Sequence, residues 1–526
     1  MQIHKYLPSE LGMVNSLLKA YLNEDPALKS FTSSSSNGPH YQDRISTRGF
    51  SVDSRVLLTD ALKRQYLRWN VLTKENEARL DLLMDPSTFT VTTGHQLNLF
   101  GGPAFFIYKV LSTIKLAEEQ SVILGTKVLP VFWMASEDHD FEEIHTTHLF
   151  TKKVSWERSA GGAVGRMSLD GLSKCLNELS EILRLEVTSN LLSMLNNALE
   201  TSNSYADFHA KLIHYVFRNE ELIVIDADDA ELKQQFSEVM RQELSDSPTL
   251  SNVQIATQEL EALGYHGQVH PREINLFYLS EGKRERILKT SDGFSLVNST
   301  KSWSGDEILE ELENHPEQFS PNALLRPVYQ ECILPNLAYL GGPGELAYWF
   351  QLKSTFEHFN IPMPHLILRN QAFVIPKHIH KNWEQFNVTF TDFLKDSHVL
   401  TSEWAADQAS ISLEKERIQM NDLIESLAQK FQTLDPSLSP MINAVGKKWD
   451  KDLDGLNKKV MQATKRKNEV AVGKLVKAQN FLFPDRIPQE RHQNFLALKN
   501  GSSEDLMAVL KKEFSSTGNQ VLLLKE

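Results

Sequence analysis

Short apolar runs alternate with amphipathic stretches between about residues 89 and 375. Five of these runs have the length of buried strands, and they lie at 89–93, 128–134, 222–226, 274–278 and 366–368. Stretches with apolar residues three and four positions apart predict the helices between them, at 104–120, 171–200, 204–218, 229–245, 305–315 and 344–360. Strands that alternate with helices indicate βαβ units, so we expect an α/β fold with a parallel sheet covered on both faces.

The segments on either side of this region have a different pattern. Residues 11–21 and 56–83 have helical spacing, and the serine-rich segment 31–43 between them is typical of a solvated linker. Charged amphipathic helices are expected at 411–431 and 450–480, and the proline turn at 435–440 joins them into an αα-hairpin. Such a hairpin is a packing arm or a dimerisation arm.

The change of pattern predicts three parts of the chain. We expect a catalytic core with N-terminal helices and inserted segments at 1–377, and a helical coiled-coil arm at 378–480. A C-terminal segment at 481–526 is expected to return to the core, and its apolar run 521–524 is a candidate added strand.

Composition and charge narrow the class of protein. The 526 residues carry a net charge of −13, which argues against a nucleic-acid footprint because such proteins gather lysine and arginine. The two cysteines, Cys175 and Cys332, form neither a disulfide framework nor a zinc pattern. No run of about 18 apolar residues predicts a membrane span, and the N-terminus does not resemble a signal peptide. We therefore expect a cytoplasmic protein.

The first candidate site is the turn between the strand at 89–93 and the helix at 104–120. A strand, a glycine turn and a helix together can offer free backbone N–H groups to an anion. The turn matches neither a P-loop nor the GxGxxG fingerprint, so a purely structural turn is equally open. The candidate ligand-binding residues here are Gly94, His95, Gln96, Gly101, Gly102 and Lys109.

The second candidate site follows the strand at 128–134, where the sequence reads Ser-Glu-Asp-His-Asp. His139 lies between Asp138 and Asp140, and a carboxylate beside an imidazole is typical of a general base. We take these three as candidate catalytic residues and Glu137 as a binding residue. A metal site is the competing interpretation. Its ligands would be His139, Glu142, Glu143, His145 and His148, although their spacing fits no zinc motif.

Two further candidate sites come later in the chain. Arg326 opens an expected irregular stretch and can bind a carboxylate or phosphate with two hydrogen bonds. A second Gly-Gly-Pro turn leads into a helix that carries aromatic residues, with Gly341, Gly342, Gly344, Glu345, Tyr348 and Trp349 as candidate binding residues. Arg369 and Asn370 follow the last strand. Ligands bind beyond the carboxyl ends of parallel strands, so we expect these positions to lie at one edge.

Four of these segments together resemble one family, the bacillithiol-biosynthesis cysteine-adding enzymes (the BshC family of cysteine ligases). The resemblance covers essentially the whole chain, and its matching segments are TGHQLNLFGGPAFFIYK (93–109), PVFWMASEDHDFEEI (130–144), LRPVYQECILPNLAYLGGPGELAYW (325–349) and LILRN (366–370). Members of the family more often have glutamine at the position of His95.

The resemblance implies a fold and a reaction. The fold would be a Rossmann-like core with inserted connecting segments and a helical coiled-coil domain that forms a homodimer. The reaction would join cysteine through an amide to the amine of glucosaminyl-malate, which gives bacillithiol. The core is similar to that of cysteinyl-tRNA synthetase, so ATP would activate the cysteine carboxylate, with Mg²⁺ accompanying the nucleotide as the only metal. This chain lacks the HIGH and KMSKS motifs and the cysteine-rich zinc site of that synthetase.

Amide formation requires a deprotonated amine and stabilisation of an oxyanion. We assign the base role to His139, oriented by Asp138 or Asp140, and the contacts to malate carboxylates or a phosphate to Lys109, Arg326 and Arg369. The rival functions are another ATP-dependent amino-acid ligase, a metal-dependent hydrolase and a non-catalytic scaffold built on the αα-hairpin.

Overall fold

The computed structural model describes residues 1–34, 41–159, 161–183, 185–408, 411–500, 502 and 505–526. Residues Met1–Val374 and Glu490–Leu524 form one compact unit, and Ile375–Gln489 with Lys525–Glu526 form a second. The expected boundaries were at 377 and 480. The serine-rich linker expected at 31–43 falls in part on residues outside those that are described.

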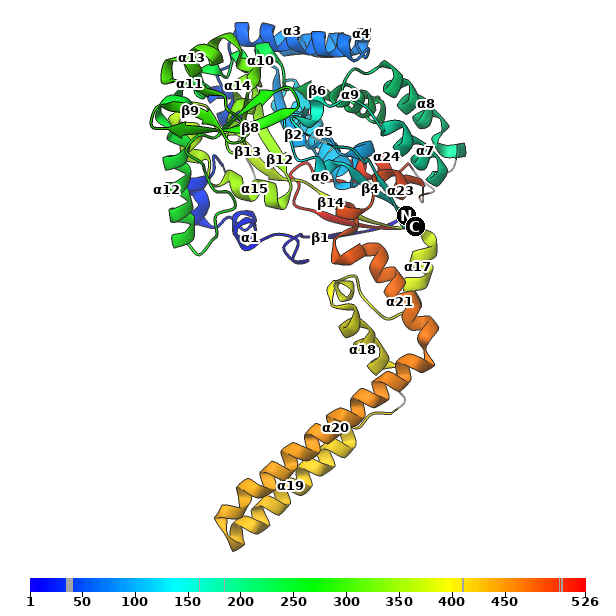
Figure 1. The fold of residues 1–526 in the computed structure, drawn as a ribbon. Helices are drawn as coiled ribbons and strands as arrows, with labels where there is room; N and C mark the ends of the chain where they lie inside the picture. Colours follow the sequence, from blue (N-terminus) through cyan, green and yellow to red (C-terminus); the bar gives the residue numbers. More distant parts are fainter. Residues whose placement is uncertain (35–40, 160, 184, 409–410, 501, 503–504) are drawn as a thin grey trace. The chain divides into compact units, whose positions relative to one another are not determined.

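A five-stranded parallel sheet forms the centre of the first unit (Figure 1). Its strands, in spatial order, are β13 (His365–Leu368), β12 (Asn336–Gly341), β2 (Phe89–His95), β3 (Val128–Met134) and β6 (Ile223–Asp226). Four of these strands were expected from apolar runs. The α/β fold class is confirmed, with a Rossmann-like N-terminal domain and a helical arm.

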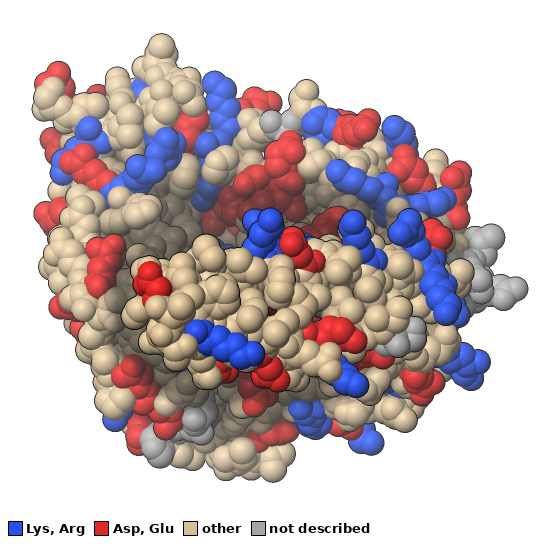
Figure 2. All heavy atoms as spheres, turned by 90° about the horizontal axis from the view of Figure 1, so that it is seen from below, with Lys and Arg blue, Asp and Glu red and all other residues tan. Residues whose placement is uncertain are grey.

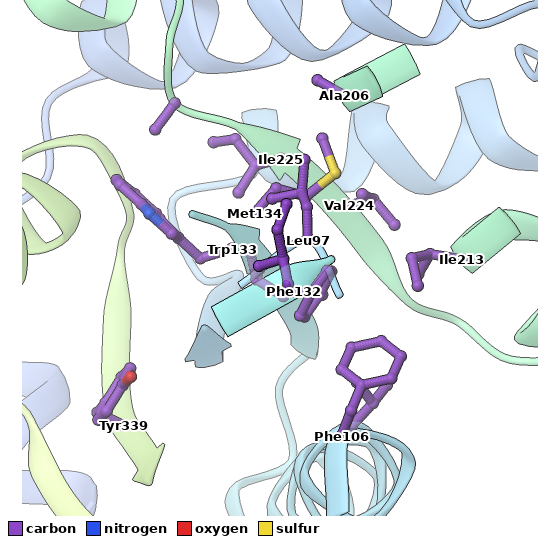
Figure 3. Packing of buried hydrophobic residues seen from close by; sticks show 14 of the residues in the cluster. Leu97, Phe106, Phe132, Trp133, Met134, Ala206, Ile213, Val224, Ile225 and Tyr339 are labelled. Atoms are coloured by element: carbon purple, nitrogen blue, oxygen red, sulfur yellow. The ribbon is translucent and has the colours of Figure 1, made fainter. Parts of the chain in front are cut away.

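Helices cover both faces of this sheet. Successive side chains of a strand point to opposite faces, and Phe132 and Trp133 of β3 follow this rule. The Phe132 ring packs 5.2 Å from Phe106 of α5 (Phe105–Leu124), whereas the Trp133 ring packs 5.3 Å from Tyr329 of α14 (Arg326–Ile333). Figure 3 shows Phe132 and Trp133 leaving the strand in different directions, with Phe106 facing Phe132. Both faces are therefore apolar, as a buried parallel sheet requires.

The remaining strands form three smaller sheets. An antiparallel sheet has the spatial order β10 (Ser302–Trp303), β9 (Gly293–Leu296), β8 (Lys283–Thr290), β7 (Leu276–Ser280) and β11 (Phe319–Pro321). A three-stranded sheet joins β1 (Gln2–Tyr6), β15 (Val521–Lys525) and β14 (Gln371–Ile375), which are far apart in the sequence. A hairpin joins β4 (Thr146–Leu149) to β5 (Lys152–Ser155). The C-terminal apolar run thus adds a strand, as expected.

Two expectations about strands are wrong. The run at 274–278 belongs to β7 of the antiparallel sheet and not to the parallel sheet. The stretch after Arg326, expected to be irregular, contains α14 and β12, the second strand in the order of the parallel sheet. Strand β12 was missed because NLAYLGG ends in glycines that are typical of a turn.

Several expected long helices are interrupted. The stretch 56–83 forms α3 (Val52–Arg68) and α4 (Lys74–Asp81), because Asn70 adopts a left-handed φ of 56° between them. The other interrupted stretches are 171–200, 229–245, 344–360 and, in the second unit, 450–480. The helices of the first unit outside α3, α4, α5 and α14 are α1 (Ser16–Leu22), α2 (Tyr41–Thr47), α6 (Phe141–Ile144), α7 (Leu172–Ile182), α8 (Leu185–Thr201), α9 (Tyr205–Val216), α10 (Ala230–Gln234), α11 (Ser237–Asp246), α12 (Pro248–Ala262), α13 (Gly305–Asn314), α15 (Pro343–Trp349), α16 (Lys353–His358), α22 (Gln489–His492), α23 (Phe495–Asn500) and α24 (Leu506–Glu513).

The second unit contains the expected αα-hairpin. Helices α19 (Glu414–Leu434) and α20 (Ser439–Lys467) lie side by side (Figure 1). Gly446 permits this approach, because an added Cβ there would lie 2.9 Å from the side chain of Ile424. Arg417 of α19 forms ion pairs with Asp450 and Asp454 of α20. The unit also contains α17 (Lys377–Trp383), α18 (Ser397–Asp407) and α21 (Glu469–Leu482).

Acidic and basic side chains are interspersed over the face drawn in Figure 2. A group of acidic side chains is also gathered near the middle of this face. Among the described helices, none combines the length and the apolar character that crossing a membrane requires.

We predict that one buried histidine makes the first unit sensitive to acid. Burial lowers the pKa of His209 to about 3, and both ring nitrogens lack a hydrogen-bond partner among the described residues. In the unfolded chain the pKa returns to about 6.5, so the unfolded state binds the proton and stability falls as the pH drops below that value. This histidine alone should cost about 2 kcal/mol at pH 5.

Urea denaturation between pH 7.5 and 5 measures this effect. The variant His209→Leu should have a shallower loss of stability with falling pH, whereas replacement of the exposed His270 by leucine should leave the slope unchanged. An identical slope in the wild type and His209→Leu would contradict the prediction.

Candidate functional site

The register of the parallel strands brings their carboxyl ends to one level. His95, the last residue of β2, pairs with Met134 of β3, and Met134 pairs with Asp226 of β6. The segments that follow these three residues therefore emerge at the same edge of the sheet. Gly341 of β12 pairs with Leu368 of β13, which brings the second glycine turn and Arg369 to that edge as well.

Asp138 is the centre of a polar cluster at this edge. Its carboxylate accepts hydrogen bonds from Gln96 Nε2 at 2.6 Å and from the backbone N–H of His139 at 2.8 Å. Arg284 Nη1, from β8 of the antiparallel sheet, lies 3.4 Å from the same carboxylate. Burial alone would raise the pKa of Asp138, but hydrogen bonds from His139 and Gln96 and the charge of Arg284 lower it overall. Asp138 is therefore a carboxylate anion.

The expected pairing of His139 with an aspartate differs from the observed geometry. His139 Nδ1 lies 2.9 Å from Arg284 Nη1 but 3.5 Å from Asp138 Oδ1. Asp140 is exposed at the start of α6, and its charge helps to raise the pKa of Glu143, after the larger effect of burial. Arg284 is thus closer to His139 Nδ1 than Asp138 is, a contact that the sequence did not indicate.

A second cluster joins the two glycine turns. Lys109 Nζ of α5 forms an ion pair with Glu345 Oε2 at 2.7 Å and also donates to the carbonyl of Gly94. Glu345 also accepts hydrogen bonds from Tyr339 and from the N–H of Gly342. Burial would raise the pKa of Glu345, but the nearby charges of Lys109 and Arg326 and these hydrogen bonds lower it. The N–H of Gly342 and two of the three N–H donors of Lys109 are thus used within the protein.

Arg326 differs from Lys109 because most of its donors remain available. It is the first residue of α14 and is half-buried, and its Nη2 donates to the Tyr348 hydroxyl at 2.9 Å. A guanidinium has five N–H donors in a planar fork, which suits a carboxylate or a phosphate. Burial would lower its pKa, but Tyr348, Tyr339 and Glu345 raise it overall. Arg326 is therefore the best-placed cation of the predicted set for an anionic ligand.

Arg369, Asn370 and Trp349, which were expected to bind a ligand, are buried and contact other residues of the protein. The Arg369 guanidinium, 1% exposed, binds both carboxylate oxygens of Glu490 at 2.6 and 3.1 Å. Asn370 is buried, and its side-chain Nδ2 donates hydrogen bonds to Ser112 Oγ and to the carbonyl of Ser515. The Trp349 ring is buried and stacks 4.4 Å from Tyr339. The sequence could not reveal Glu490 as a partner because it lies 121 residues from Arg369.

His95 and the first Gly-Gly-Pro turn lie against α5. The half-buried His95 packs between Phe105 and Phe106, and its Nε2 lies 2.8 Å from Asn98 Nδ2. Burial, with smaller effects from Lys109 and other cations, lowers its pKa well below the usual value. Gly101 and Gly102 have positive φ angles, and a Cβ on Gly102 would clash with Asn98 at 2.4 Å. These glycines are therefore required by the turn itself.

The second glycine turn has two different kinds of glycine. A Cβ on Gly341 would lie 2.7 Å from Leu346, so this glycine permits close packing of α15 on β12. A Cβ added to Gly344 would meet no atom within 4 Å, so close packing does not require glycine at this position.

A third cluster, which the sequence analysis missed, follows β6. Lys233 Nζ forms ion pairs with Glu137 at 2.7 Å and with Asp228 at 2.8 Å, and Arg166 binds both oxygens of Asp228 at 2.6 Å. Burial would raise the pKa of Asp228, but Lys233 and Arg166 lower it. The signal was available, since Asp228 follows an expected strand within the acidic sequence DADD. Glu137 is thus bound to Lys233 within the protein.

The loop 163–166 covers the end of β3. The N–H of Gly165 donates to the Ser136 carbonyl at 2.8 Å, and the N–H of Val164 donates to the Asp138 carbonyl at 2.7 Å. A Cβ on Gly165 would lie 2.5 Å from that of Ser136, so only glycine fits. A pocket of about 780 Å³ opens beside Arg166. Another, of about 470 Å³ around Trp69, shares no lining residue with the three clusters.

The competing metal interpretation required five ligands from the 139–148 segment. His148 instead stacks on His492 with ring centroids 4.2 Å apart, and His145 Nδ1 lies 3.0 Å from the Glu142 carbonyl. In the described part of the chain, no group of three or more His, Cys, Asp or Glu side chains is arranged to hold a metal ion.

Comparison with known proteins identifies relatives along the whole chain. The family model of the bacillithiol biosynthesis BshC N-terminal Rossmann-like domain matches residues 1–370, and that of the BshC C-terminal coiled-coil domain matches residues 372–526. A protein of Flavobacterium johnsoniae is 37% identical over 511 residues, which cover 95% of each chain. One of Flavobacterium psychrophilum is 36% identical and covers 94% of each chain. Both relatives have the name "Putative cysteine ligase BshC".

We predict that Arg369 acts through its ion pair with Glu490 and stabilises the fold. The variants Arg369→Gln and Glu490→Gln each leave one buried charge without its partner, which should cost about 3–5 kcal/mol. Both should therefore lower the midpoint of thermal unfolding by several degrees.

Two further variants test the assignment. Replacing both partners by apolar residues, Arg369→Met with Glu490→Leu, should recover most of the loss, because no buried charge remains. Arg64→Gln removes a surface pair with Glu231 and should have little effect. Unchanged melting of Arg369→Gln would show that the buried pair does not stabilise the fold.

Proposed function

Because the chain belongs to the BshC family of bacillithiol biosynthesis, we propose that it is a cysteine ligase that joins the cysteine carboxylate to the amine of glucosaminyl-malate. The observation that carries the proposal is the match of both domains, over nearly the full length, to relatives with that name. The product is the amide bacillithiol. ATP activates the cysteine carboxylate, so that one of its oxygens can leave with a phosphate-bearing group.

The charges at the sheet edge support this choice of substrates. Glucosaminyl-malate carries two carboxylates, and Arg326 offers an accessible guanidinium fork to such a group. Cysteine and glucosaminyl-malate both carry amines, and Asp138 is an anion at the same edge. We assign Arg326 to the malate carboxylates and Asp138 to an ammonium group. No phosphate contact is assigned to Lys109 or Arg369, because each forms an ion pair with a carboxylate of the protein.

The proposal predicts a thiol product of defined composition. Purified protein incubated with cysteine, glucosaminyl-malate and ATP should form bacillithiol, detected by mass spectrometry, and omission of ATP should abolish the product. Serine or alanine in place of cysteine separates this activity from that of another amino-acid ligase. Failure to form the amide with any amino acid, by folded protein and with Mg²⁺ present, would contradict the ligase function.

Arg326 should determine the affinity for the dicarboxylate substrate. A hydrogen bond to a charged group contributes about 1.5–3 kcal/mol, so Arg326→Gln should raise the KM for glucosaminyl-malate roughly 10- to 100-fold. The KM for cysteine should change little. The control is Arg241→Gln, which removes a partly exposed arginine of α11. Equal changes in both KM values would contradict a specific contact with malate.

A further inference from the structure

Arg284 connects the inserted antiparallel sheet to the polar cluster around Asp138. Its side chain is 6% exposed, and its Cζ lies 4.0 Å from the ring centroid of Phe277. Nε donates to Ser320 Oγ at 3.2 Å, and Nη2 donates to the Pro321 carbonyl at 3.0 Å. Residues of β7 and β11 thus contact the face of the guanidinium and its Nε and Nη2 atoms. The remaining nitrogen, Nη1, points toward Asp138 and His139.

The contact with His139 determines which imidazole nitrogen carries the proton. Arg284 Nη1 lies 2.9 Å from His139 Nδ1, and a guanidinium can only donate. Nδ1 must therefore accept, which leaves the proton of a neutral imidazole on Nε2. Pairing with Asp138 would require the opposite tautomer, with the proton on Nδ1. The Asp138 carboxylate instead binds Gln96 and the backbone N–H of His139.

We propose, on the basis of the ligase function above, that Arg284 is a positioning residue that holds His139 as the Nε2–H tautomer. In this form His139 is a hydrogen-bond donor and not the base that the sequence indicated. The side chain of His139 is 49% exposed, so its Nε2 can reach a bound substrate. The group that it serves is the carbonyl oxygen of the activated cysteine.

The donor role fits the charge that develops during amide formation. The amine nitrogen forms a bond to the carbonyl carbon, and the electrons of the C=O bond move to the oxygen. The Nε2–H of His139 stabilises this oxyanion. The intermediate then re-forms the C=O bond and expels the phosphate-bearing group, and the proton of the amine passes to solvent. A donor of this kind contributes about 10²- to 10³-fold to the rate.

The tautomer can be measured without substrate. In protein labelled with ¹⁵N-histidine, long-range ¹H–¹⁵N correlation spectra distinguish a protonated ring nitrogen from an unprotonated one, and His139→Gln identifies the resonances of His139. We expect His139 Nδ1 of the wild type to be unprotonated. In Arg284→Met, the His139 ring should no longer be held in this single tautomer. Arg286→Met, which changes an exposed arginine of the same strand, should keep it. A protonated Nδ1 in the wild type, or an unchanged tautomer in Arg284→Met, would overturn the role of Arg284.

Kinetics of two His139 variants test the donor role. The amide nitrogen of glutamine can replace Nε2–H as a donor, but glutamine cannot act as a base. His139→Ala should lower kcat by about 100-fold or more, whereas His139→Gln should retain most of the activity. Equal losses in the two variants would overturn the donor role. Absence of ligation by the wild type would contradict the proposed ligase function. It would not contradict the role of Arg284 in fixing the tautomer, because the NMR spectra measure that tautomer without substrate.

Discussion

The parallel register of β2, β3 and β6 determines where the reactive groups of this protein lie. Because His95, Met134 and Asp226 are level with one another, the chain leaves all three strands at the same edge. Gln96 and Asp138 can meet only for this reason, and so can Glu137 and Asp228 through Lys233. A shift of one residue in β3 would also exchange the faces of its side chains, so that Phe132 and Trp133 would lose their partners Phe106 and Tyr329.

The groups at this edge are largely neutralised by internal partners. Lys109, Lys233 and Arg369 are each bound to carboxylates within the protein, since an unpaired buried charge would cost several kcal/mol. This leaves a short set of groups that can act on a ligand, which includes the half-buried Arg326 and the exposed His139. The internal pairs hold the glycine turns and strand ends in position around that set.

Local patterns predicted the parts of this fold that depend on neighbours in sequence. The runs at β2, β3, β6 and β13 are short, apolar and followed by helices, and the candidate residues after them do lie at one edge. Partners that are distant in sequence could not be predicted. Arg284 reaches His139 across 145 positions, and its role depends on how the inserted sheet packs. Strand β12 was hidden because its apolar residues lead directly into glycines.

The pair of Arg369 and Glu490 has a consequence for the order of events during synthesis. The first unit is discontinuous in sequence, and its closing segment begins at Glu490, after residues Ile375–Gln489 of the second unit. While the chain emerges from the ribosome, Arg369 has no counter-ion until more than a hundred further residues have been made. The core therefore cannot complete its folding before the arm has been translated, and a chain that stops within the arm leaves a cation at the sheet edge without its partner.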